Sequence, residues 1–464
     1  MRCSGIAAVL MTALASGCTS LPPRAPLDAA HLTQDFAARR LDALPGLPPP
    51  QSGWNAEEWF RAALELNPEL AEARAAARSA AASEVTAAER PNPTLNLFAE
   101  YVTAAAQSAA WLYGLSMEFL LPQPGVRARA RESAALQTQA AESDIAETLW
   151  HVRAQVQQAL LDAAYANDTT ALLKTLVADR EALLGANRAL AQAGEIASAE
   201  TLIQDVELAR ARERLVRSQA LAIDAEVRLA GAVGVSVAAL DGIALRWQNW
   251  ADIGALDPAP ASDWRTAALI GRPKVIRALR EYDVADVALQ SEVARRWPQF
   301  HVTPGYAWDK SGLHQQELDD SLHDTLHDNE LGVSFELPIF NQHQGPIGEA
   351  LARRELAGKH LQVVQADIFA EIERAERAWP QAQQAWRAAA GARALAERQR
   401  AAEERAFSAG SSDRSNLLAA QLASTEAQLS SLEVAYDAQL AFAALENAYR
   451  RPLGAPEHAA VARS

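Results

Sequence analysis

One phrase occurs twice in this chain, and the duplication constrains its fold more than any other feature. "LYGLSMEFLLPQPG" spans Leu112 to Gly125, and "ELGVSFELPIFNQHQG" spans Glu330 to Gly345. The glycines of the shared pattern, Gly114 and Gly332, lie 218 residues apart. A repeat with so long a period indicates two copies of one structural unit rather than unrelated domains.

The repeat begins upstream of the quoted phrase. Trp264 and Pro273 follow Trp59 and Pro68 at a common spacing of 205 residues. Each Trp–Pro pair predicts a short helix, a proline break and a second helix that ends at another proline. The expected segments are a signal peptide at 1–17, a lipidated extended segment at 18–53, a first repeat at 54–262, a second repeat at 263–451 and a C-terminal tail at 452–464.

Each repeat also contains two runs in which apolar and polar residues alternate. Period two over eight to ten residues predicts half-buried strands, and this length also suits a tilted strand in a membrane. We expect strands at about 93–121 and 298–340, with Trp111, Trp297 and Trp308 near strand ends, where an interfacial aromatic belt would place them. The positions expected on the apolar face are Leu95, Leu97, Ala99, Tyr101, Tyr113, Leu115, Met117 and Phe119 in the first copy and Phe300, Val302, Tyr306, Leu331, Val333, Phe335 and Leu337 in the second.

A long helical hairpin follows the strands in each copy. The first is expected at about 126–231, where Gly194 provides the C-cap and Ser198 the N-cap of its turn. The second is expected at about 347–450, turning near Gly410, with a kink at Pro380. The first helix of the first hairpin is expected from Val126 to Gln192, which is 67 residues. At about 1.5 Å per residue this helix is roughly 100 Å long, which exceeds the size of one globular domain.

Four half-apolar strands cannot close a barrel, because about eight strands are the practical minimum. Open strand edges are not tolerated in lipid, so several chains must pool their strands symmetrically. The predicted fold class is therefore mainly α with a small β part. Internally duplicated coiled hairpins would form a trimeric α-barrel, and four strands per chain would contribute to a twelve-stranded transmembrane β-barrel.

The N-terminus predicts export. "MRCSGIAAVLMTALASGC" contains one Arg, an apolar run and small residues before Cys18, and the run is too short to span a bilayer. "LASGC" resembles a bacterial lipobox, which would make Cys18 the lipidated first residue; the alternative is an ordinary cleaved signal. The formal net charge of −15 argues against nucleic acid as a partner, because phosphates require a basic surface.

The duplicated strand phrases and the two helix turns, "AGEIASAETLIQ" and "AGSSDRSNLLAAQ", resemble the TolC-like outer membrane factor family over nearly everything after residue 50. "PQPGVRARAR" and "LPIFNQHQG" look most similar to its heavy-metal, cobalt-zinc-cadmium type branch. The resemblance implies a homotrimer in the outer membrane with a periplasmic extension. It further implies docking to a periplasmic adaptor and to an inner-membrane pump of the resistance-nodulation-division type, so that substrates pass to the exterior.

By the same resemblance, a carboxylate about six residues past the first turn glycine narrows the periplasmic entrance. That position is Glu200, whereas the second copy has Asn416 there, with Asp413 nearer the turn. Rings of carboxylates at a constriction would favour cations. The alternative for Glu200 is an acid that stabilises a helix N-terminus through the dipole.

Adaptor docking is expected at the two turns. The candidates are Gly194 and Gly410, with Leu202 and Leu418 as apolar contacts. Turn conformation alone also accounts for the glycines, and both roles are compatible.

The segment between the last two strands contains His314, His323 and His327 among several aspartates. If this segment were helical, the i, i+4 spacing of His323 and His327 would allow both to bind one divalent ion. The alternative is a hydrated surface loop.

No catalytic or cofactor-binding motif is present in the sequence, which predicts a protein that is not an enzyme and has no cofactor. A periplasmic coiled-coil adaptor lipoprotein is the alternative from another class, but an adaptor needs one hairpin, and this chain has two. Within the channel interpretation, the substrate remains open between metal cations and organic compounds or drugs.

Overall fold

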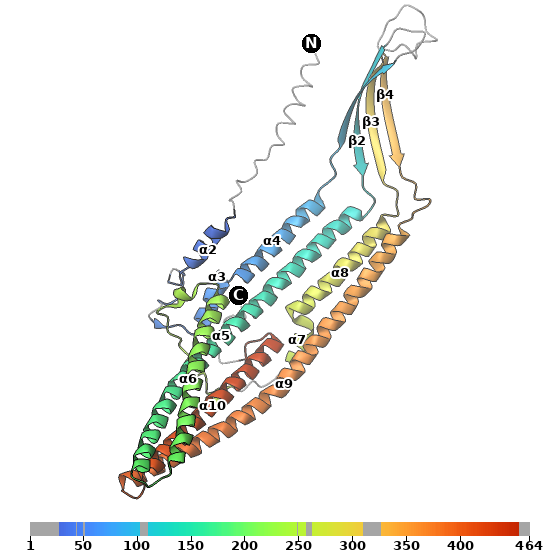
Figure 1. Cartoon of the computed structure of the whole chain (residues 1–464). Coiled ribbons are helices and arrows are strands. Elements are labelled where there is room, and N and C mark those ends of the chain that lie inside the picture. The colour runs from blue at the N-terminus through green and yellow to red at the C-terminus, as the bar shows by residue number, and fades with distance from the viewer. Residues whose placement is uncertain are drawn as a thin grey trace, which may run out of the picture.

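The computed structural model describes residues 27–42, 44–49, 52–102, 110–247, 249–256, 262–309 and 326–453. The molecule is elongated, with strands at one end, helices along most of its length and two helix turns at the other end (Figure 1). No helix in these ranges combines the length and the hydropathy needed to cross a bilayer.

The four strands form one antiparallel sheet in the order β1-β2-β3-β4. They are β1 (Thr94–Val102), β2 (Ala110–Leu121), β3 (Phe300–Asp309) and β4 (Leu326–Phe335). The pairing of β2 with β3 joins the two repeats, so β1 and β4 are the sheet edges within the chain.

The strand register confirms the predicted apolar face. Leu115 pairs with Leu97 on one side and with Tyr306 on the other, and Phe300 pairs with Phe335. Residues paired across antiparallel strands share a face, so the predicted apolar positions of all four strands lie together. This face is uncovered, since Leu97 is 72% exposed.

The helices form the predicted hairpins, with small changes at their ends. The described helices are α2 (Ala29–Ala37), α3 (Ala56–Leu66), α4 (Pro68–Ala88), α5 (Val126–Gln192), α6 (Ser198–Val233), α7 (Ser262–Gly271), α8 (Pro273–Ala294), α9 (Gln344–Ser408) and α10 (Arg414–Tyr449), with short 3-10 turns η2 (Val237–Leu240) and η3 (Ile253–Ala255). The two long helices contain 67 and 65 residues. Pro380 lies inside α9 and does not end it.

Two shorter helices lie along each long one. Helices α4 and α6 pack against α5, while α8 and α10 pack against α9, and α5 also contacts α8 and α10. The helices therefore form a layer in which α5 is central and α6 and α9 lie at opposite edges (Figure 1).

In each repeat the two shorter helices meet end to end, α4 with α6 in the first repeat and α8 with α10 in the second. The contact is built in the same way in both repeats. Asn67 precedes α4 and donates from Nδ2 to the carbonyl of Ala232, at 2.8 Å. Arg272 precedes α8 and donates from Nη1 to the carbonyl of Ala448, at 3.3 Å. Each bond satisfies a carbonyl near the C-terminus of the other short helix of the repeat, α6 or α10. We call these two places the stacking junctions.

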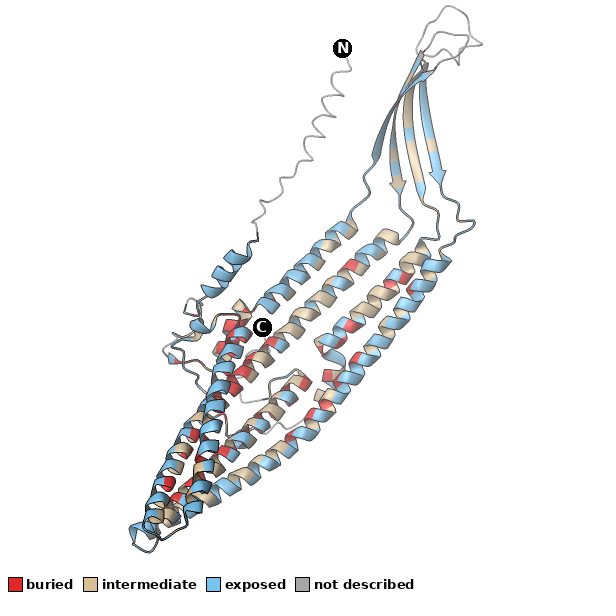
Figure 2. Cartoon of the chain, viewed as in Figure 1, coloured by how far each residue is buried: buried red, intermediate tan, exposed pale blue. Residues whose placement is uncertain are grey.

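The apolar core is concentrated around the stacking junctions. Trp54, Trp59 and Leu160 are buried in the first repeat, and Ile368 and Ile372 in the second. Figure 2 shows the buried residues in the helical part, whereas the strands are almost entirely exposed or intermediate. The sheet therefore lacks a core of its own in a single chain.

Candidate functional site

The face of the sheet opposite the apolar one is polar. Here His301 Nδ1 lies 2.5 Å from Glu118 Oε1, across the pairing of β2 with β3. Phe98 also lies on this face, and its ring covers Gly114, where an added Cβ would overlap the ring. The ring therefore explains the glycine in the first strand phrase, but the same test at Gly332 gives ordinary contacts of 3.7 Å.

Both helix turns end in the same glycine motif. Gly194 has φ +79°, and Glu195 N donates to the carbonyl of Leu190 at 3.0 Å. Gly410 has φ +72°, and Ser411 N donates to the carbonyl of Ala406 at 2.9 Å. A positive φ favours glycine, and these bonds satisfy the last helix carbonyls. The predicted turn glycines therefore have a structural role, and a docking role stays a prediction.

The predicted N-cap at Ser198 is wrong. Helix α6 begins at Ser198 with Ala197 as its N-cap, and no side chain caps it. Glu200 is exposed in the first turn of α6, where the positive end of the helix dipole favours a carboxylate. A gating role for Glu200 stays a prediction.

The second turn is capped differently. Asp413 is the N-cap of α10 and accepts a hydrogen bond from Asn416 N at 2.7 Å. Asp413 and Asn416, both predicted at the gate, are therefore joined by a helix-capping bond, which fixes the Asp413 carboxylate at the helix start. Their side chains are exposed, and their gating role also stays a prediction.

The two leucines predicted to contact an adaptor lie in different environments. Leu202 is 65% exposed on α6, beside Ile203 and Val206, which are also exposed. Leu418 is only 7% exposed and packs in a cluster with Leu176 and other leucines of α5 and α10. Leu418 is therefore packed in the core of the single chain, which argues against a docking contact, and its docking role stays a prediction. The sequence analysis treated Leu202 and Leu418 alike because they occupy equivalent positions after the two turns. Their different burial depends on which face of α10 packs against α5, and the sequence does not show this.

Ion pairs hold the hairpins together near the turns. Arg214 lies 3.1 Å from Glu426, and Arg180 lies 3.8 Å from the same carboxylate and 3.7 Å from Glu207. The group links α5, α6 and α10. Exposed ion pairs contribute little individually, but a network that joins three helices restricts how the lower ends of the two repeats separate.

A buried carboxylate connects the same three helices further from the turns. Asp162 is 7% exposed and accepts hydrogen bonds from Arg228 at 2.7 Å, Tyr436 OH at 2.7 Å and Gln158 at 2.8 Å. Burial and the adjacent Asp162 carboxylate raise the pKa of Tyr436 to about 12. The sequence analysis missed this group, because its members are far apart in the chain and form no local motif.

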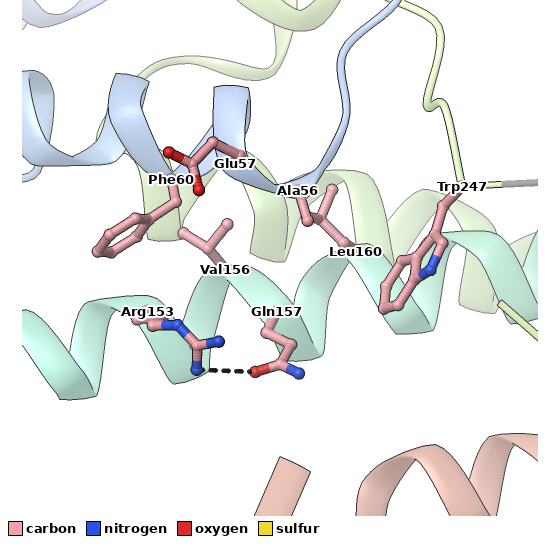
Figure 3. Close-up of a pocket in the computed structure, with 8 residues that line it drawn as sticks. All are labelled: Ala56, Glu57, Phe60, Arg153, Val156, Gln157, Leu160 and Trp247. Atoms are coloured by element: carbon pink, nitrogen blue, oxygen red, sulfur yellow. Dashed lines mark hydrogen bonds between the residues drawn. The ribbon is translucent and has the colours of Figure 1, made fainter. Parts of the chain in front are cut away.

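Figure 3 shows a pocket between α3 and α5, lined on one side by Trp247. Its walls are Phe60, Val156 and Leu160, and the Arg153 side chain donates to Gln157 at 3.5 Å. Glu57, Arg153 and Gln157 are the polar residues of its lining.

The predicted metal ligands are not brought together in the described part of the chain. His314 and His323 lie outside the described residues, and His327 is in strand β4 opposite Trp308. A strand at His327 does not provide the helical spacing on which the pair with His323 depended. No cluster of three metal-binding side chains occurs among the residues that were placed. Cys18 also lies outside them.

The sequence matches the family model described as "Outer membrane efflux protein" twice, over residues 59–235 and 264–449. No curated protein sequence matches this chain.

Solved structures share the fold over nearly its whole length. A membrane protein from Pseudomonas aeruginosa has a TM-score of 0.69 at 19% identity, covering 93% of this chain and 99% of that one. The outer-membrane channel OprN has a TM-score of 0.69 at 17% identity, covering 94% and 99%. The Campylobacter jejuni CmeC outer membrane channel has a TM-score of 0.66 at 14% identity, covering 93% of each chain.

Proposed function

The chain belongs to the outer membrane efflux protein family, whose members are channels rather than enzymes, and from this premise we propose that it forms a homotrimeric outer membrane channel that exports heavy-metal cations. In this proposal the channel provides passive exit for substrates that a periplasmic adaptor and an inner-membrane pump, of the resistance-nodulation-division type, deliver to it.

The observation that carries the proposal is the pair of open sheet edges. Strands β1 and β4 have no partner on their outer sides within the described sheet, although the sheet has a continuous apolar face. In lipid, edge N–H and C=O groups must be paired, so β1 of one copy would pair with β4 of the next. Three copies close a barrel of about twelve strands, which exceeds the lower practical limit.

The helical layer supports the same closure. Its edge helices carry exposed apolar side chains, including Ile223 on α6 and Leu395 on the lower half of α9, which are 65% and 60% exposed. Contact between α6 of one copy and α9 of the next would bury them and extend the tube below the sheet. The two helix turns would then surround the entrance and meet the adaptor.

Metal cations are the proposed substrates on two grounds. The sequence is similar to the heavy-metal branch, and its formal net charge is −15. An acidic wall attracts cations, although bulk charge acts on attraction more than on selectivity. The second candidate is the same channel serving organic compounds or drugs.

We also propose that Cys18 is acylated, which would anchor the mature N-terminus in outer membrane lipid.

Cysteine pairs test the trimer directly, because the chain contains only two cysteines, Cys3 and Cys18, both in the N-terminal segment. One cysteine replaces Asn96 in β1, and a second scans residues 328–334 in β4. Two strands separate β1 from β4 in one sheet, about 14 Å at the usual strand spacing, so a disulfide can form only between copies. Covalent trimers after oxidation are expected, and their absence at every register would refute this closure.

The substrate is tested by deleting the gene in its host and comparing growth in graded Zn, Co, Cd, Ni and Cu with growth in dyes and antibiotics. Metal hypersensitivity that the wild-type chain reverses is the expected result. Sensitivity to organic compounds alone would leave the channel intact and refute the metal assignment.

A further inference from the structure

A pocket rich in arginine and aromatic residues lies at the stacking junction of the second repeat. It is formed where α5, α7, the start of α8 and the end of α10 meet. The residues that matter here are Trp150, Trp264, Arg272, Tyr449, Arg450 and Arg451. We call it the second-junction pocket.

The equivalent place in the first repeat holds a piece of extended chain. Arg39, from the segment after α2, donates to the carbonyl of Leu66 at 3.0 Å and to the carbonyl of Gly234 at 2.7 Å. The neighbouring Leu41 is only 2% exposed. By the repeat spacing of 205 residues, Leu66 corresponds to Gly271, which lines the second-junction pocket. In the first repeat a peptide segment of the chain itself therefore binds at this place. We call this binding place the first seat and the equivalent second-junction pocket the second seat.

The two seats differ in charge. Asn67 of the first junction is replaced by Arg272 in the second. The residues that follow the short helices differ in the same sense, with Gly234 and Val235 in the first repeat and Arg450 and Arg451 in the second. The first seat is neutral and accepts a cation, Arg39. The second seat contains three arginines. Arg272 and Arg450 are paired with carboxylates of the chain, and Arg451 remains for an anion.

These guanidinium groups have hydrogen-bonding capacity to spare. Arg272 is 3% exposed and pairs with Glu371 at 2.8 Å, but its buried Nε has no acceptor. Arg450 pairs with Glu147 at 2.5 Å, and its buried Nε also lacks an acceptor. Both Nε atoms are buried, so a ligand in the pocket can contact them only if the local packing changes.

The third guanidinium is the accessible one. Arg451 stacks over the ring of Trp264 at 4.8 Å and forms no ion pair among the described residues. A stacked guanidinium keeps its edge free for a carboxylate, which it binds in a bidentate manner. Trp150 and Tyr449 provide apolar walls beside it.

We propose that the second-junction pocket binds an acidic peptide segment of a partner protein, with a carboxylate on Arg451 and an apolar side chain against Trp150 and Trp264. The occupied first seat favours a peptide over a small anion, and the guanidinium groups select acidic residues. The pocket lies on the face that carries α7, far along the molecule from the helix turns, so this contact is independent of adaptor docking there (Figure 1).

The test uses the purified full-length protein in detergent and a fluorescein-labelled peptide of alternating Glu and Leu as the probe. Binding is measured by fluorescence anisotropy at low and at high salt, and a Gln–Leu peptide of equal length is the probe control. Arg451→Glu is the test variant, since the side chain is exposed and its replacement leaves the core intact. Arg217→Glu on α6, where Arg217 is 75% exposed, makes the same charge change elsewhere.

We expect the Glu–Leu peptide to bind in a salt-sensitive manner, Arg451→Glu to weaken binding at least about tenfold, and Arg217→Glu to have little effect. Equal binding of the Gln–Leu peptide, or equal loss in the two variants, would refute the proposal. Binding that appears only after removal of residues 454–464 would show that the chain's own tail fills the pocket and would overturn its assignment to a partner. A trimer that crosslinks normally but binds no acidic peptide would refute this inference alone and leave the proposed channel unaffected.

Discussion

Replacing Leu418 with Ala tests whether the start of α10 is core or docking surface. Leu418 is 7% exposed within its leucine cluster, so its truncation removes buried contacts and leaves a cavity. Buried Leu→Ala changes cost about 2–5 kcal/mol, and we expect about 2–3 kcal/mol because this small cluster near a helix end can relax. Leu202→Ala is the matched control, because a side chain that is 65% exposed loses at most about 0.5–1 kcal/mol.

Hydrogen exchange measured by mass spectrometry on peptides covering 414–429 provides the assay, since local opening does not require the whole protein to unfold. A loss of 2–3 kcal/mol corresponds to about 30- to 150-fold faster exchange in Leu418→Ala, whereas Leu202→Ala should change exchange less than about fivefold. Adaptor binding should fall in Leu202→Ala instead. Wild-type exchange in Leu418→Ala, or equal acceleration in both variants, would refute the packing described above.

Three further perturbations have defined outcomes. Asp413→Ala should cost about 1 kcal/mol and speed exchange of the first-turn amides of α10 about fivefold, whereas Asp413→Asn retains the cap. Raising the pH from about 10 to about 12 should reduce stability in thermal melts, because the unfolded chain ionises Tyr436 near 10, while burial and the Asp162 carboxylate keep its pKa at about 12 in the folded chain; Tyr436→Phe should remove this part of the loss. Gly114→Ala should reduce assembled trimer on unheated gels, because its Cβ meets the Phe98 ring, and adding Phe98→Ala should restore assembly.

Each of these outcomes has a clear opposite. Equal exchange in Asp413→Ala and Asp413→Asn would show that the cap contributes nothing. An unchanged alkaline transition in Tyr436→Phe would assign the pH dependence to other groups. Full assembly of Gly114→Ala would show that the Phe98 ring moves aside at little cost.

The sequence allowed the strands, their shared apolar face and both helical hairpins to be predicted. The alternation of apolar and polar residues predicted the strand register correctly, because a slip of one residue would turn Leu97 and Leu115 to the polar face. The long helices were predictable because proline is absent over most of their length and because the same order of strands, long helix and glycine turn occurs in both repeats. The repeat also located the turn glycines, whose φ values depend on local geometry alone.

Sites that depend on packing between distant segments were not predictable in this way. Leu418 and Leu202 occupy equivalent places in the repeats, but α5 lies against only one of the two faces. Asp162 gains its partners from helices more than sixty residues away in the chain. The repeat did align Asn67 with Arg272, and Gly234 and Val235 with Arg450 and Arg451, and these charge differences are the signal of the second-junction pocket in the sequence.

The stacking junctions give the molecule unequal mechanical properties along its length. Helices α5 and α9 run unbroken from the strand end to the helix turns, whereas their neighbours are divided midway, at Asn67 and Arg272. A force applied at the helix turns is transmitted to the sheet by α5 and α9, because the continuous backbone hydrogen bonds of these two helices resist axial strain. The divided columns lack this backbone continuity, and side-chain bonds together with the buried apolar core hold their two halves together, so the junctions are where the lower half can twist while the sheet keeps its shape.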